Sequence, residues 1–546
     1  MPARTRMVAI ALALLLTAVT PVRAANTPTI QIVDSIRPGA NGSFPQSFAP
    51  LGNYLYFRAD DGVNGTELWR TDGTTTTLVE DINPAGDGEP YGLTAFGGYI
   101  YFGADDGTHS FELWRTNGTT TELVEDIESD EGFDSSPNGF TPFGGYLYFR
   151  ARTFELGREL WRTNGTTTEL VKDIHPDFSS NPQDFTPHGG YLYFSASDGD
   201  HGYELWRTDG TVTELVHDIY PGLSDSYPDN LVSHGGYLYF SATDGSYGYE
   251  LWRTDGTTTA LVKNISSSGD SNPTSLTPLG GYLYFRAKDD TNGYELWRTN
   301  GSTTELVEDI HPSGDSNPSG FTVFGNHLYF SASDLISGEE LWRTNGETTE
   351  LVADINGPGI GDSYPAGFTE VGGYLYFQAG TDGYRVWRTN GTTTEAVPFT
   401  TTGVYPSAYS GPSIRAALNG RLFLTVDSAA TGTEFAWLTA SARASASVRP
   451  SVSGQAKIGK KLTAVKGTWG GVPTPSFRYQ WYACTSPVTT ARTTLVSWCR
   501  PIAGATKSTF TVSRAQKGRY IAVLVTGTSS GTLPTKWLSK TTTKVP

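Results

Sequence analysis

A unit of about 45 residues recurs along most of this chain, and it constrains the fold more than any other feature. A period in this range is typical of repeat architectures. A degenerate ninth copy ends at Trp437. The tryptophans of the first eight copies are separated by 45, 47, 45, 46, 45, 45 and 45 residues and stand at Trp69, Trp114, Trp161, Trp206, Trp252, Trp297, Trp342 and Trp387.

Each unit is predicted to contain four β-strands. In one unit the expected strands are 319–324, 327–332, 340–344 and 349–355. An Asp-Gly or Asn-Gly pair separates the last two strands of eight units, and it favours a two-residue type I′ turn in which both residues have positive φ. Adjacent apolar residues within the strands point to opposite faces of the sheet. Sheets covered on both faces are typical of propeller blades or solenoid layers.

The two ends of the repeat region complement each other. Residues 29–36 match the fourth strand of a unit, whereas the ninth unit lacks a fourth strand. We therefore expect an all-β, closed β-propeller in which the N-terminal strand completes the last four-stranded blade. The count gives nine blades, and eight blades with one irregular element remain open because most propellers have four to eight.

The motif E-L-W-R-T-[D/N]-G-T carries a resemblance to a known family. The units resemble the bacterial family named for its ELWxxDGT repeats over roughly residues 30–440. Copy eight departs from the motif with Arg385-Val386-Trp387, and copy nine has lost the turn. The resemblance implies an extracellular β-propeller-like repeat protein at residues 25–440, and it carries over no catalytic residue.

The C-terminal residues 448–546 form a second expected domain, joined by a linker at 441–447. Gly467-Thr468-Trp469, residues 479–484 and Gly518-Arg519-Tyr520 resemble an immunoglobulin-like domain of actinobacterial secreted proteins. The resemblance implies a small β-sandwich in which Trp481 is buried. The two cysteines of the chain, Cys484 and Cys499, are predicted to form one disulfide, because an even count in an exported protein suggests pairing.

The first 24 residues are predicted to be a signal peptide. Two arginines precede an apolar run at 8–19, and small residues surround a cleavage site between Ala24 and Ala25. No later apolar run is long enough for a transmembrane segment. We expect a secreted, extracellular protein, free or held on the cell wall without a covalent bond.

Charge is divided unevenly along the chain. Residues 441–546 contain 16 Lys and Arg and no Asp or Glu, whereas the mature repeats contain 20 basic and 56 acidic residues, a net charge of −36. Each part is soluble through its own charge, or the basic part binds an anionic polymer and the acidic part binds cations. The sequence leaves both interpretations open.

Acidic loops are the candidate metal sites. Carboxylates on short loops suit Ca²⁺, the one cofactor that the sequence suggests. Turns also require Asp and Gly for backbone reasons, and no loop has the complete EF-hand pattern, so ordinary turns are the alternative. The candidate ligands are Asp60, Asp61, Asp105, Asp106, Asp198, Asp200, Asp244, Asp289 and Asp290.

Aromatic residues give two kinds of candidate. The repeated tryptophans are predicted to fill the core, because every copy stands mid-strand beside a leucine. Aromatic residues expected in loops are the candidate ligand contacts, namely Phe111, Tyr203, Tyr247, Tyr249 and Tyr294. Repeated charged residues such as Glu112, Arg115 and Asp126 are predicted to form a structural charge pair, and no catalytic set is identified.

These features favour a secreted, non-enzymatic binding or adhesion protein. Its propeller would be a multivalent display platform for glycans, cell-wall polymers or surface proteins. The alternatives are an extracellular glycan-processing hydrolase or lyase with its site in the central funnel, and a structural cell-envelope protein. The sequence has no nucleic-acid-binding signature. An enzyme would need one asymmetric group of residues, which the repeats do not reveal.

Overall fold

The computed structural model describes residues 30–32, 36–130, 132–359, 361–380, 384–397, 411–428, 432–439, 445–470, 476–489, 496, 498–528 and 535–546. Within these ranges the regular structure is β-strand, apart from one 3-10 turn, η1 (Arg514–Gln516). The predicted cleavage site at Ala24 and Ala25 lies outside the described residues. None of the described helical structure is long and apolar enough to cross a membrane.

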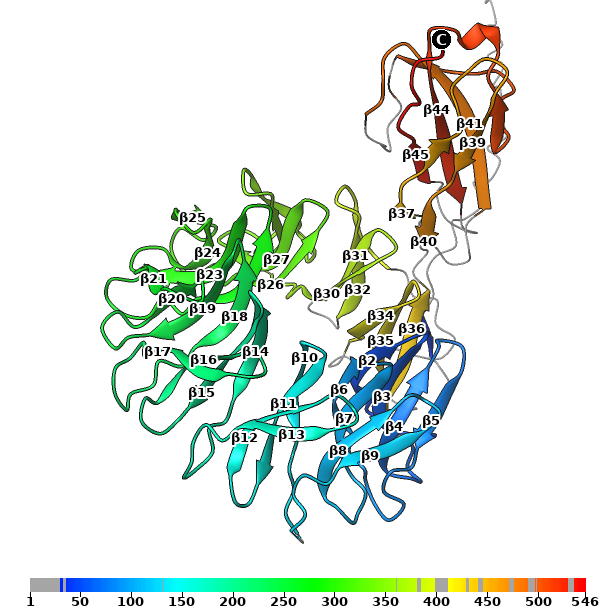
Figure 1. Cartoon of the computed structure of the whole chain (residues 1–546). Coiled ribbons are helices and arrows are strands. Elements are labelled where there is room, and N and C mark those ends of the chain that lie inside the picture. Colours follow the sequence, from blue (N-terminus) through cyan, green and yellow to red (C-terminus); the bar gives the residue numbers. More distant parts are fainter. Residues whose placement is uncertain are drawn as a thin grey trace, which may run out of the picture.

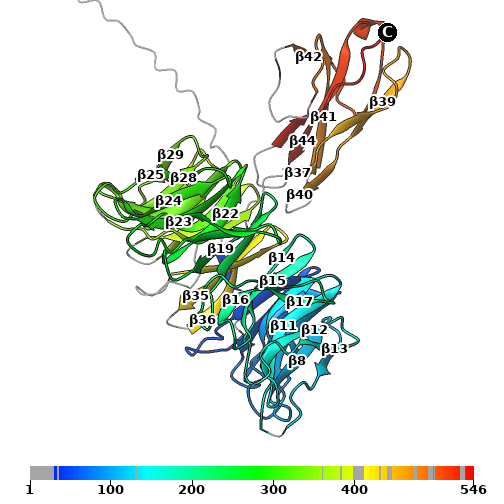
Figure 2. The same cartoon turned by 60° about the vertical axis from the view of Figure 1, so that its left-hand side comes forward.

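The repeats form nine four-stranded antiparallel sheets within the described part of residues 30–439. Figures 1 and 2 show these sheets following one another around a common centre. We number them sheets 1 to 9 in chain order and call the first strand of each sheet its inner strand. In sheet 9, which also contains the N-terminal strand, the inner strand is β34 (Ser413–Leu418). The sequence prediction of an all-β fold built from repeated four-stranded units is confirmed.

The strand bounds repeat closely from sheet to sheet. Sheets 1 to 3 contain β2 (Gln46–Leu51), β3 (Tyr54–Asp60), β4 (Thr66–Thr71), β5 (Thr76–Glu80), β6 (Tyr91–Phe96), β7 (Tyr99–Asp105), β8 (Phe111–Thr116), β9 (Thr121–Glu125), β10 (Asn138–Phe143), β11 (Tyr146–Thr153), β12 (Gly157–Thr163) and β13 (Thr168–Lys172). Sheets 4 to 6 contain β14 (Gln183–His188), β15 (Tyr191–Ser197), β16 (Tyr203–Thr208), β17 (Thr213–His217), β18 (Asp229–His234), β19 (Tyr237–Thr243), β20 (Tyr249–Thr254), β21 (Thr259–Lys263), β22 (Thr274–Leu279), β23 (Tyr282–Asp289), β24 (Gly293–Thr299) and β25 (Thr304–Glu308). Sheets 7 to 9 contain β26 (Ser319–Phe324), β27 (His327–Asp334), β28 (Gly338–Thr344), β29 (Thr349–Ala353), β30 (Ala366–Val371), β31 (Tyr374–Ala379), β32 (Arg385–Thr389), β33 (Thr394–Ala396), β34 (Ser413–Leu418), β35 (Arg421–Ser428), β36 (Gly432–Thr439) and β1 (Ile30–Ile32).

The core lies between neighbouring sheets, because the second strand of each sheet is buried on both faces. Between sheets 1 and 2, Tyr56 and Leu68 pack against Ile100 and Phe102. The repeated tryptophans take part in this packing, as Trp114 does in the same cluster. Three of them are buried and the others are half-buried, which fits a structural role.

The predicted type I′ turns at the Asp-Gly and Asn-Gly pairs are wrong. Thr71 pairs with Thr76, so this turn contains four residues rather than two. Gly73 has a φ of 80°, whereas Asp72 is not among the residues with positive φ. The Asp72 carboxylate instead accepts the backbone N–H groups of residues 74 and 75, at 2.7 and 2.9 Å. The side chain therefore stabilises a longer turn that needs left-handed backbone only at the glycine.

Type I′ geometry occurs instead at the Gly-Gly pairs that join the first two strands of a sheet. Gly97 and Gly98 have φ values of 58° and 86°. They connect Phe96 directly to its pairing partner Tyr99. Two consecutive left-handed residues match the twist of the flanking strands, and glycine adopts this conformation without steric strain.

The predicted charge pair among Glu112, Arg115 and Asp126 is also wrong. Glu112 and Arg115 are three residues apart on one strand, so they point to opposite faces of the sheet. Arg115 donates to the Glu122 carboxylate at 2.7 Å and to the Gly165 carbonyl of the next sheet at 2.6 Å. Equivalent bonds to a turn in the next sheet are made by Arg70, Arg162, Arg207, Arg253, Arg298 and Arg343.

Glu112 has a separate structural role, because it is fully buried and joins sheet 2 to the segment that leads into sheet 3. Its carboxylate accepts the backbone N–H of Ile127 at 2.8 Å and the backbone N–H of Ser135 at 2.9 Å. The Ser135 hydroxyl donates a third bond at 2.6 Å. Burial raises the pKa of Glu112 to about 7, against the opposing effect of these hydrogen bonds.

The last sheet combines both ends of the repeat region, as the sequence predicts. β1 pairs with β36 and completes the sheet β1-β36-β35-β34. Across the seam the rings of Phe57 and Phe435 lie 4.8 Å apart. The Thr433 carbonyl accepts the backbone N–H groups of Ser43 and Phe44 at 2.8 and 3.2 Å. β34 contacts both β30 and β2.

The C-terminal strands form three further sheets. β37 (Ser445–Val448) pairs with β40 (Thr468–Gly470). The second sheet has the order β38 (Ser451–Ser453), β39 (Lys461–Val465) and β43 (Thr509–Thr511), and the third has the order β42 (Cys499–Pro501), β41 (Ser476–Cys484), β44 (Tyr520–Thr528) and β45 (Thr535–Leu538). Leu462 of β39 and Val523 of β44 share an apolar cluster with Trp481, which is fully buried as predicted.

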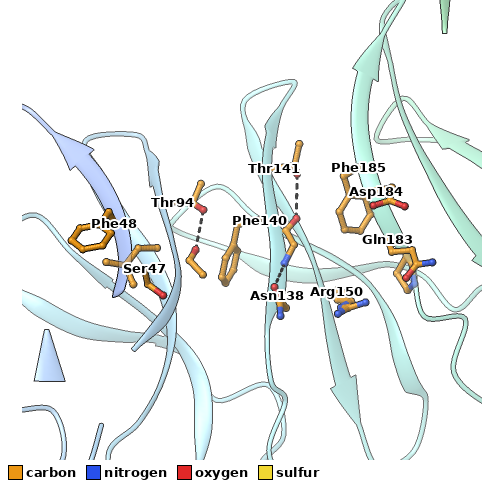
Figure 3. A pocket seen from close by; sticks show the side chains of 14 residues that line it. Ser47, Phe48, Thr94, Asn138, Phe140, Thr141, Arg150, Gln183, Asp184 and Phe185 are labelled. Atoms are coloured by element: carbon orange, nitrogen blue, oxygen red, sulfur yellow. Dashed lines mark hydrogen bonds between the residues drawn. The ribbon is translucent and has the colours of Figure 1, made fainter. Parts of the chain in front are cut away.

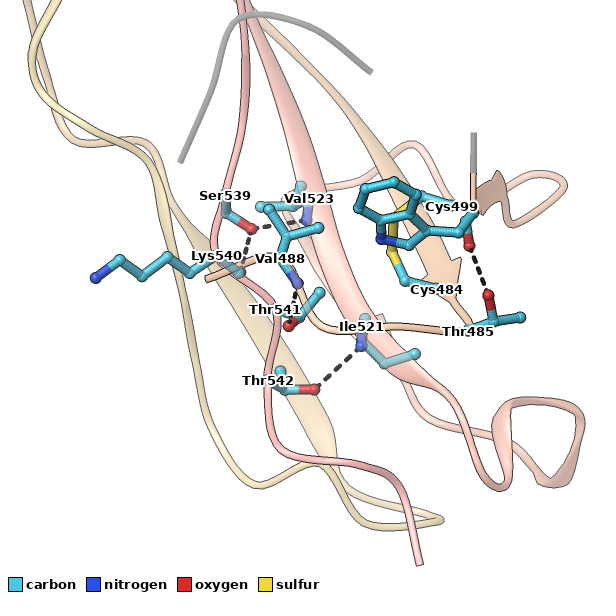
Figure 4. The surroundings of a disulfide bond; sticks show 11 residues. Cys484, Thr485, Val488, Cys499, Ile521, Val523, Ser539, Lys540, Thr541 and Thr542 are labelled. Atoms are coloured by element: carbon cyan, nitrogen blue, oxygen red, sulfur yellow. Dashed lines mark hydrogen bonds between the residues drawn. A yellow bond between two sulfur atoms is a disulfide. The ribbon is translucent and has the colours of Figure 1, made fainter. Parts of the chain in front are cut away.

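The predicted Cys484–Cys499 disulfide is confirmed. It links directly opposed residues of β41 and β42, with the Cα atoms 4.0 Å apart. Figure 4 shows the bond between these strands, with Val488 nearby. Val488 and Leu538 belong to the apolar cluster that covers the disulfide. Closing a loop of 15 residues stabilises a chain by about 3 kcal/mol, mainly by restricting the unfolded state.

Candidate ligand-binding site at the inner strands

The segment that leads into each sheet keeps the same backbone conformation in most units, but the residue before its proline differs from sheet to sheet. Eight residues that precede a buried proline have φ values between 43° and 49°, a conformation that is uncommon for residues other than glycine. Most of these residues donate their backbone N–H to the start of the third strand in the preceding sheet, as Tyr227 does to Tyr203 at 3.1 Å. The eight residues are Phe44, Glu89, Ser136, Asn181, Tyr227, Asn272, Asn317 and Tyr364.

Sequence reasoning missed these positions, although a signal was present. Most units contain Ser-x-Pro shortly before the inner strand. The serine bonds to the buried glutamate of the preceding sheet, as Ser226 does to Glu204 at 2.7 Å, and the proline is buried. The residue between them is thereby held in place without contributing to the core. A varying residue inside a constant motif indicates a position that is free to contact a ligand.

Four of the five predicted contact aromatics lie beside these positions. Their predicted placement in loops is wrong, because the third strands begin earlier than expected. Phe111, Tyr203 and Tyr249 begin the third strands of their sheets, and Tyr294 is the second residue of β24. The rings of Tyr203 and Tyr227 stack with centroids 5.5 Å apart. Tyr247 is different, because it lies in the loop between β19 and β20, where 48% of its surface is exposed.

The inner strands line three cavities. The first has a volume of about 620 Å³ and lies against β2, β6, β10 and β14. Figure 3 shows its phenylalanine rings together with Arg150, Gln183 and Asp184. A second cavity of about 330 Å³ lies against β14, β18 and β22 and shares Gln183 with the first. A third, of about 530 Å³, lies between β2 and β34.

A bulge near the start of the inner strands makes the cavity wall asymmetric. The second residue of most inner strands has positive φ, and the pairing register shifts just after it. Sheets 2 and 3 have glycine here, and a Cβ on Gly139 would lie 3.1 Å from the Phe185 ring. Asp184 and Asn230 hold the same conformation with φ values of 59° and 57°. Side chains in this strained backbone are typical of functional positions.

Asp184 is part of a carboxyl pair that only one sheet junction contains among the described residues. Burial, followed by a hydrogen bond to the Asp229 side chain, raises the pKa of Asp184 to about 6. Asp229 is the first residue of the next inner strand. The positive charge of Arg150 acts in the opposite direction on Asp184. Asp184 has an accessible surface although protein surrounds it, because it stands in an open cavity.

The candidate calcium loops lie elsewhere, between the second and third strands of their sheets. Their carboxylates bond within their own loops, as Asp106 does to the backbone N–H groups of residues 108 and 109. Asp60 pairs with Arg37, and Asp290 accepts bonds from serines 266–268. The same pattern of backbone bonds holds for Asp61, Asp105, Asp198, Asp244 and Asp289, while Asp200 donates its own N–H to Asp198.

Metal binding by these loops stays a prediction. In the parts of the chain that the structure describes, no group of three or more His, Cys, Asp or Glu side chains is placed to hold a metal ion. The loops therefore have the hydrogen bonds of ordinary Asx turns. Calcium would have to replace several of these bonds with coordination bonds, and it would need further oxygen ligands from the backbone or water.

Comparison with known proteins adds little. No protein-family model matches the chain, and no curated protein matches it. Among solved structures, a puromycin-hydrolyzing peptidase from Mycobacterium tuberculosis is similar over 62% of this chain and 58% of its own length, with 12% identity and a TM-score of 0.34. The chain thus spans less than two thirds of that protein, and a likeness at this level carries no argument about function.

Proposed function

We propose that this chain is a secreted, non-enzymatic binding protein whose ligand contacts the inner strands of a closed, nine-bladed propeller. The observation that carries the proposal is the distribution of differences between the repeats. Core residues and outer turns are nearly constant, whereas the residue before each proline and the start of each inner strand change from sheet to sheet. One asymmetric site at the centre fits this distribution better than many identical sites on the outside.

The contacts at the seam support the closed ring. Arg421, the first residue of β35 in sheet 9, donates to the Asp72 carbonyl of sheet 1 at 2.8 Å. The third-strand arginines of other sheets also bond to this turn of the next sheet, but at its glycine carbonyl. Ser43 donates to the buried Glu434 at 2.8 Å, as the equivalent serines do elsewhere. The Ser43–Glu434 bond repeats a contact of the other junctions and supports the proposal that sheets 9 and 1 are neighbours in a ring.

A glycan is the ligand class that best fits the lining. Sugar hydroxyls need donors and acceptors at fixed positions, and Asn138, Arg150 and Gln183 line the cavity of about 620 Å³. Sugar rings also pack on aromatic faces, and Phe140 and Phe185 line the same cavity.

A glycan-processing enzyme is the second candidate, and the Asp184–Asp229 pair is the feature against which it can be judged. Glycoside hydrolases generally use two carboxyl groups placed on either side of the bond that is cleaved. These groups stand about 5 to 9.5 Å apart in such enzymes. Asp184 and Asp229 are within hydrogen-bonding reach of each other, which leaves no room for a sugar between them. This spacing favours binding over hydrolysis.

The proposal is tested by screening the full mature chain against glycan and cell-wall-polymer arrays, with and without Ca²⁺. Arg150→Ala and Gln183→Ala should each weaken binding of the selected ligand about tenfold, which corresponds to about 1.4 kcal/mol. Glu347→Ala, on an exposed outer turn, is the matched control and should leave affinity unchanged. Loss of binding in the outer-turn variant alone would instead support multivalent display by the repeated loops.

We further propose that residues 448–546 form an immunoglobulin-like module that attaches the protein to anionic wall polymers. Residues 441–546 contain 16 Lys and Arg and no acidic residue. The resulting positive field attracts anionic polymers. Full-length protein should therefore sediment with anionic cell walls at low salt and be released as salt rises, because screening weakens the attraction. A chain ending at residue 440 should stay in solution, and equal sedimentation of both chains would contradict the proposal.

A further inference from the structure

We propose that the cavity of about 330 Å³ against β14, β18 and β22 binds the protonated amino group of an amino-sugar residue. This inference rests on the proposed binding function and specifies its ligand. The cavity is at the small end of the range for ligand sites. Its lining combines a carboxyl group, two tyrosines, and several amides and hydroxyls, and the described lining residues include no lysine or arginine.

The carboxyl groups define the charge of the ligand. Asp229 lines the cavity, and Asp184 lies within hydrogen-bonding reach of it on the neighbouring inner strand. Two carboxylates this close repel each other unless a proton or a cation lies between them. Arg150 influences Asp184 and lines the cavity of about 620 Å³, and it is not among the residues that line the smaller one. A ligand ammonium group would supply such a cation.

Two aromatic rings complete a site for a cation. Tyr227 and Tyr249 both line the cavity, and the faces of aromatic rings attract ammonium groups. Tyr227 is held by stacking on Tyr203, with the ring planes 18° apart. A hydrogen bond between its hydroxyl and Asp225 raises the pKa of Tyr227 to about 12, so the ring remains neutral. Asp225 also accepts the backbone N–H of Tyr203 at 2.8 Å, which keeps it in place.

The remaining lining distinguishes an amino sugar from a lysine side chain. Asn230, Asn272 and Gln183 present amides, and Ser241 and Thr274 present hydroxyls. A sugar ring has hydroxyl groups close to its amino group that bond to such side chains. A lysine has only methylene groups near its ammonium group, so it would offer no hydroxyl to Gln183, Ser241 or Thr274. Asn230 and Asn272 already donate to Asp229 and Tyr294, and their amide oxygens remain to accept from a ligand hydroxyl. The lining therefore favours the sugar.

The test compares two probes that differ only at the nitrogen, namely glucosamine oligomers and N-acetylglucosamine oligomers of equal length. Binding to the full mature chain is measured by calorimetry in slightly acidic buffer, where the free amino groups are protonated. We expect glucosamine oligomers to bind at least about tenfold more tightly. Asp229→Asn and Asp184→Asn should each remove most of this preference. Asn tolerates left-handed backbone, so Asp184→Asn should fold.

Asp200→Asn is the matched control, because it removes the same charge from an exposed outer loop. A preference that persists in both cavity variants would reflect the general negative charge of the repeats and overturn the inference. Equal binding of both oligomers would overturn the amino-group assignment while leaving the proposed glycan-binding function intact. Tighter binding of oligolysine than of glucosamine oligomers would overturn the sugar assignment. If Arg150→Ala abolishes binding of both oligomers while neither Asp variant changes it, the glycan binds in the cavity that Arg150 lines. That result would overturn this inference and leave the proposed function intact.

Discussion

Removal of residues 25–36 should destabilise the whole repeat region and make it aggregate. The deletion removes β1 and leaves β36 with unpaired N–H and C=O groups along one edge. Such an edge readily pairs with other chains. Three residue pairs join β1 to β36. At about 1 kcal/mol for each hydrogen bond, we expect a loss of about 3 kcal/mol in the free energy of unfolding. The melting temperature should fall by several degrees, with aggregation at lower temperature.

Differential scanning fluorimetry with light scattering measures both effects. A chain that begins at residue 29 retains β1 and is the matched control. A synthetic peptide of residues 29–36, added to the shortened chain, should restore part of the stability by occupying the open edge. If the shortened chain melts like the control and does not aggregate, β1 does not hold the last sheet in place.

The pairing of the N-terminal strand with the last sheet could be predicted from the sequence because the repeats can be aligned with one another. A surplus strand at 29–36 and a missing strand after Trp437 are visible once the units are aligned. The structure keeps three residues of that segment, Ile30–Ile32, in the ladder. The length of each unit and the period of its apolar residues similarly predict the four strands, since both depend on local patterning.

The turn and charge-pair predictions failed because they depend on side-chain direction and on contacts between sheets. Asp72 forms an Asx turn, which the Asp-Gly pair alone does not distinguish from a type I′ turn. Glu112 contacts Ser135, which is 23 residues away and enters the next sheet. The proximity of Asp184 and Asp229 likewise depends on how two inner strands meet, and no pattern within a single unit indicates it.

The buried glutamates should make the protein more stable near pH 5 than near pH 8. Burial raises the pKa from its ordinary value of 4.5 to about 7 in Glu67, Glu112, Glu159 and Glu204. Between these values the folded chain holds protons that the unfolded chain has released. Stability is therefore fully present below about pH 4.5 for these groups and is lost as the pH rises through about 7.

Aspartates of the turns act in the opposite direction. Hydrogen bonds from the Thr74 side chain and the turn backbone lower the pKa of Asp72, although burial opposes them. Their contribution is lost as the pH falls below the ordinary range of aspartate. The two effects together place maximum stability at about pH 5, where the glutamates are mostly protonated when folded and the aspartates are mostly ionised. Urea unfolding of the mature chain at several pH values would measure this profile.

Glu112→Gln tests the origin of the pH dependence. The variant should lose about 1 to 3 kcal/mol at low pH, because its amide group meets backbone donors where the carboxyl group accepted them. It should also reduce the difference in unfolding free energy between about pH 5 and pH 8, since one group no longer titrates. The matched control is Glu122→Gln, which changes the more exposed carboxylate that pairs with Arg115. It should leave the difference in unfolding free energy between about pH 5 and pH 8 unchanged. If the pH profile of Glu112→Gln runs parallel to that of the unaltered chain, the buried glutamates are ionised when folded and the pH dependence has another source.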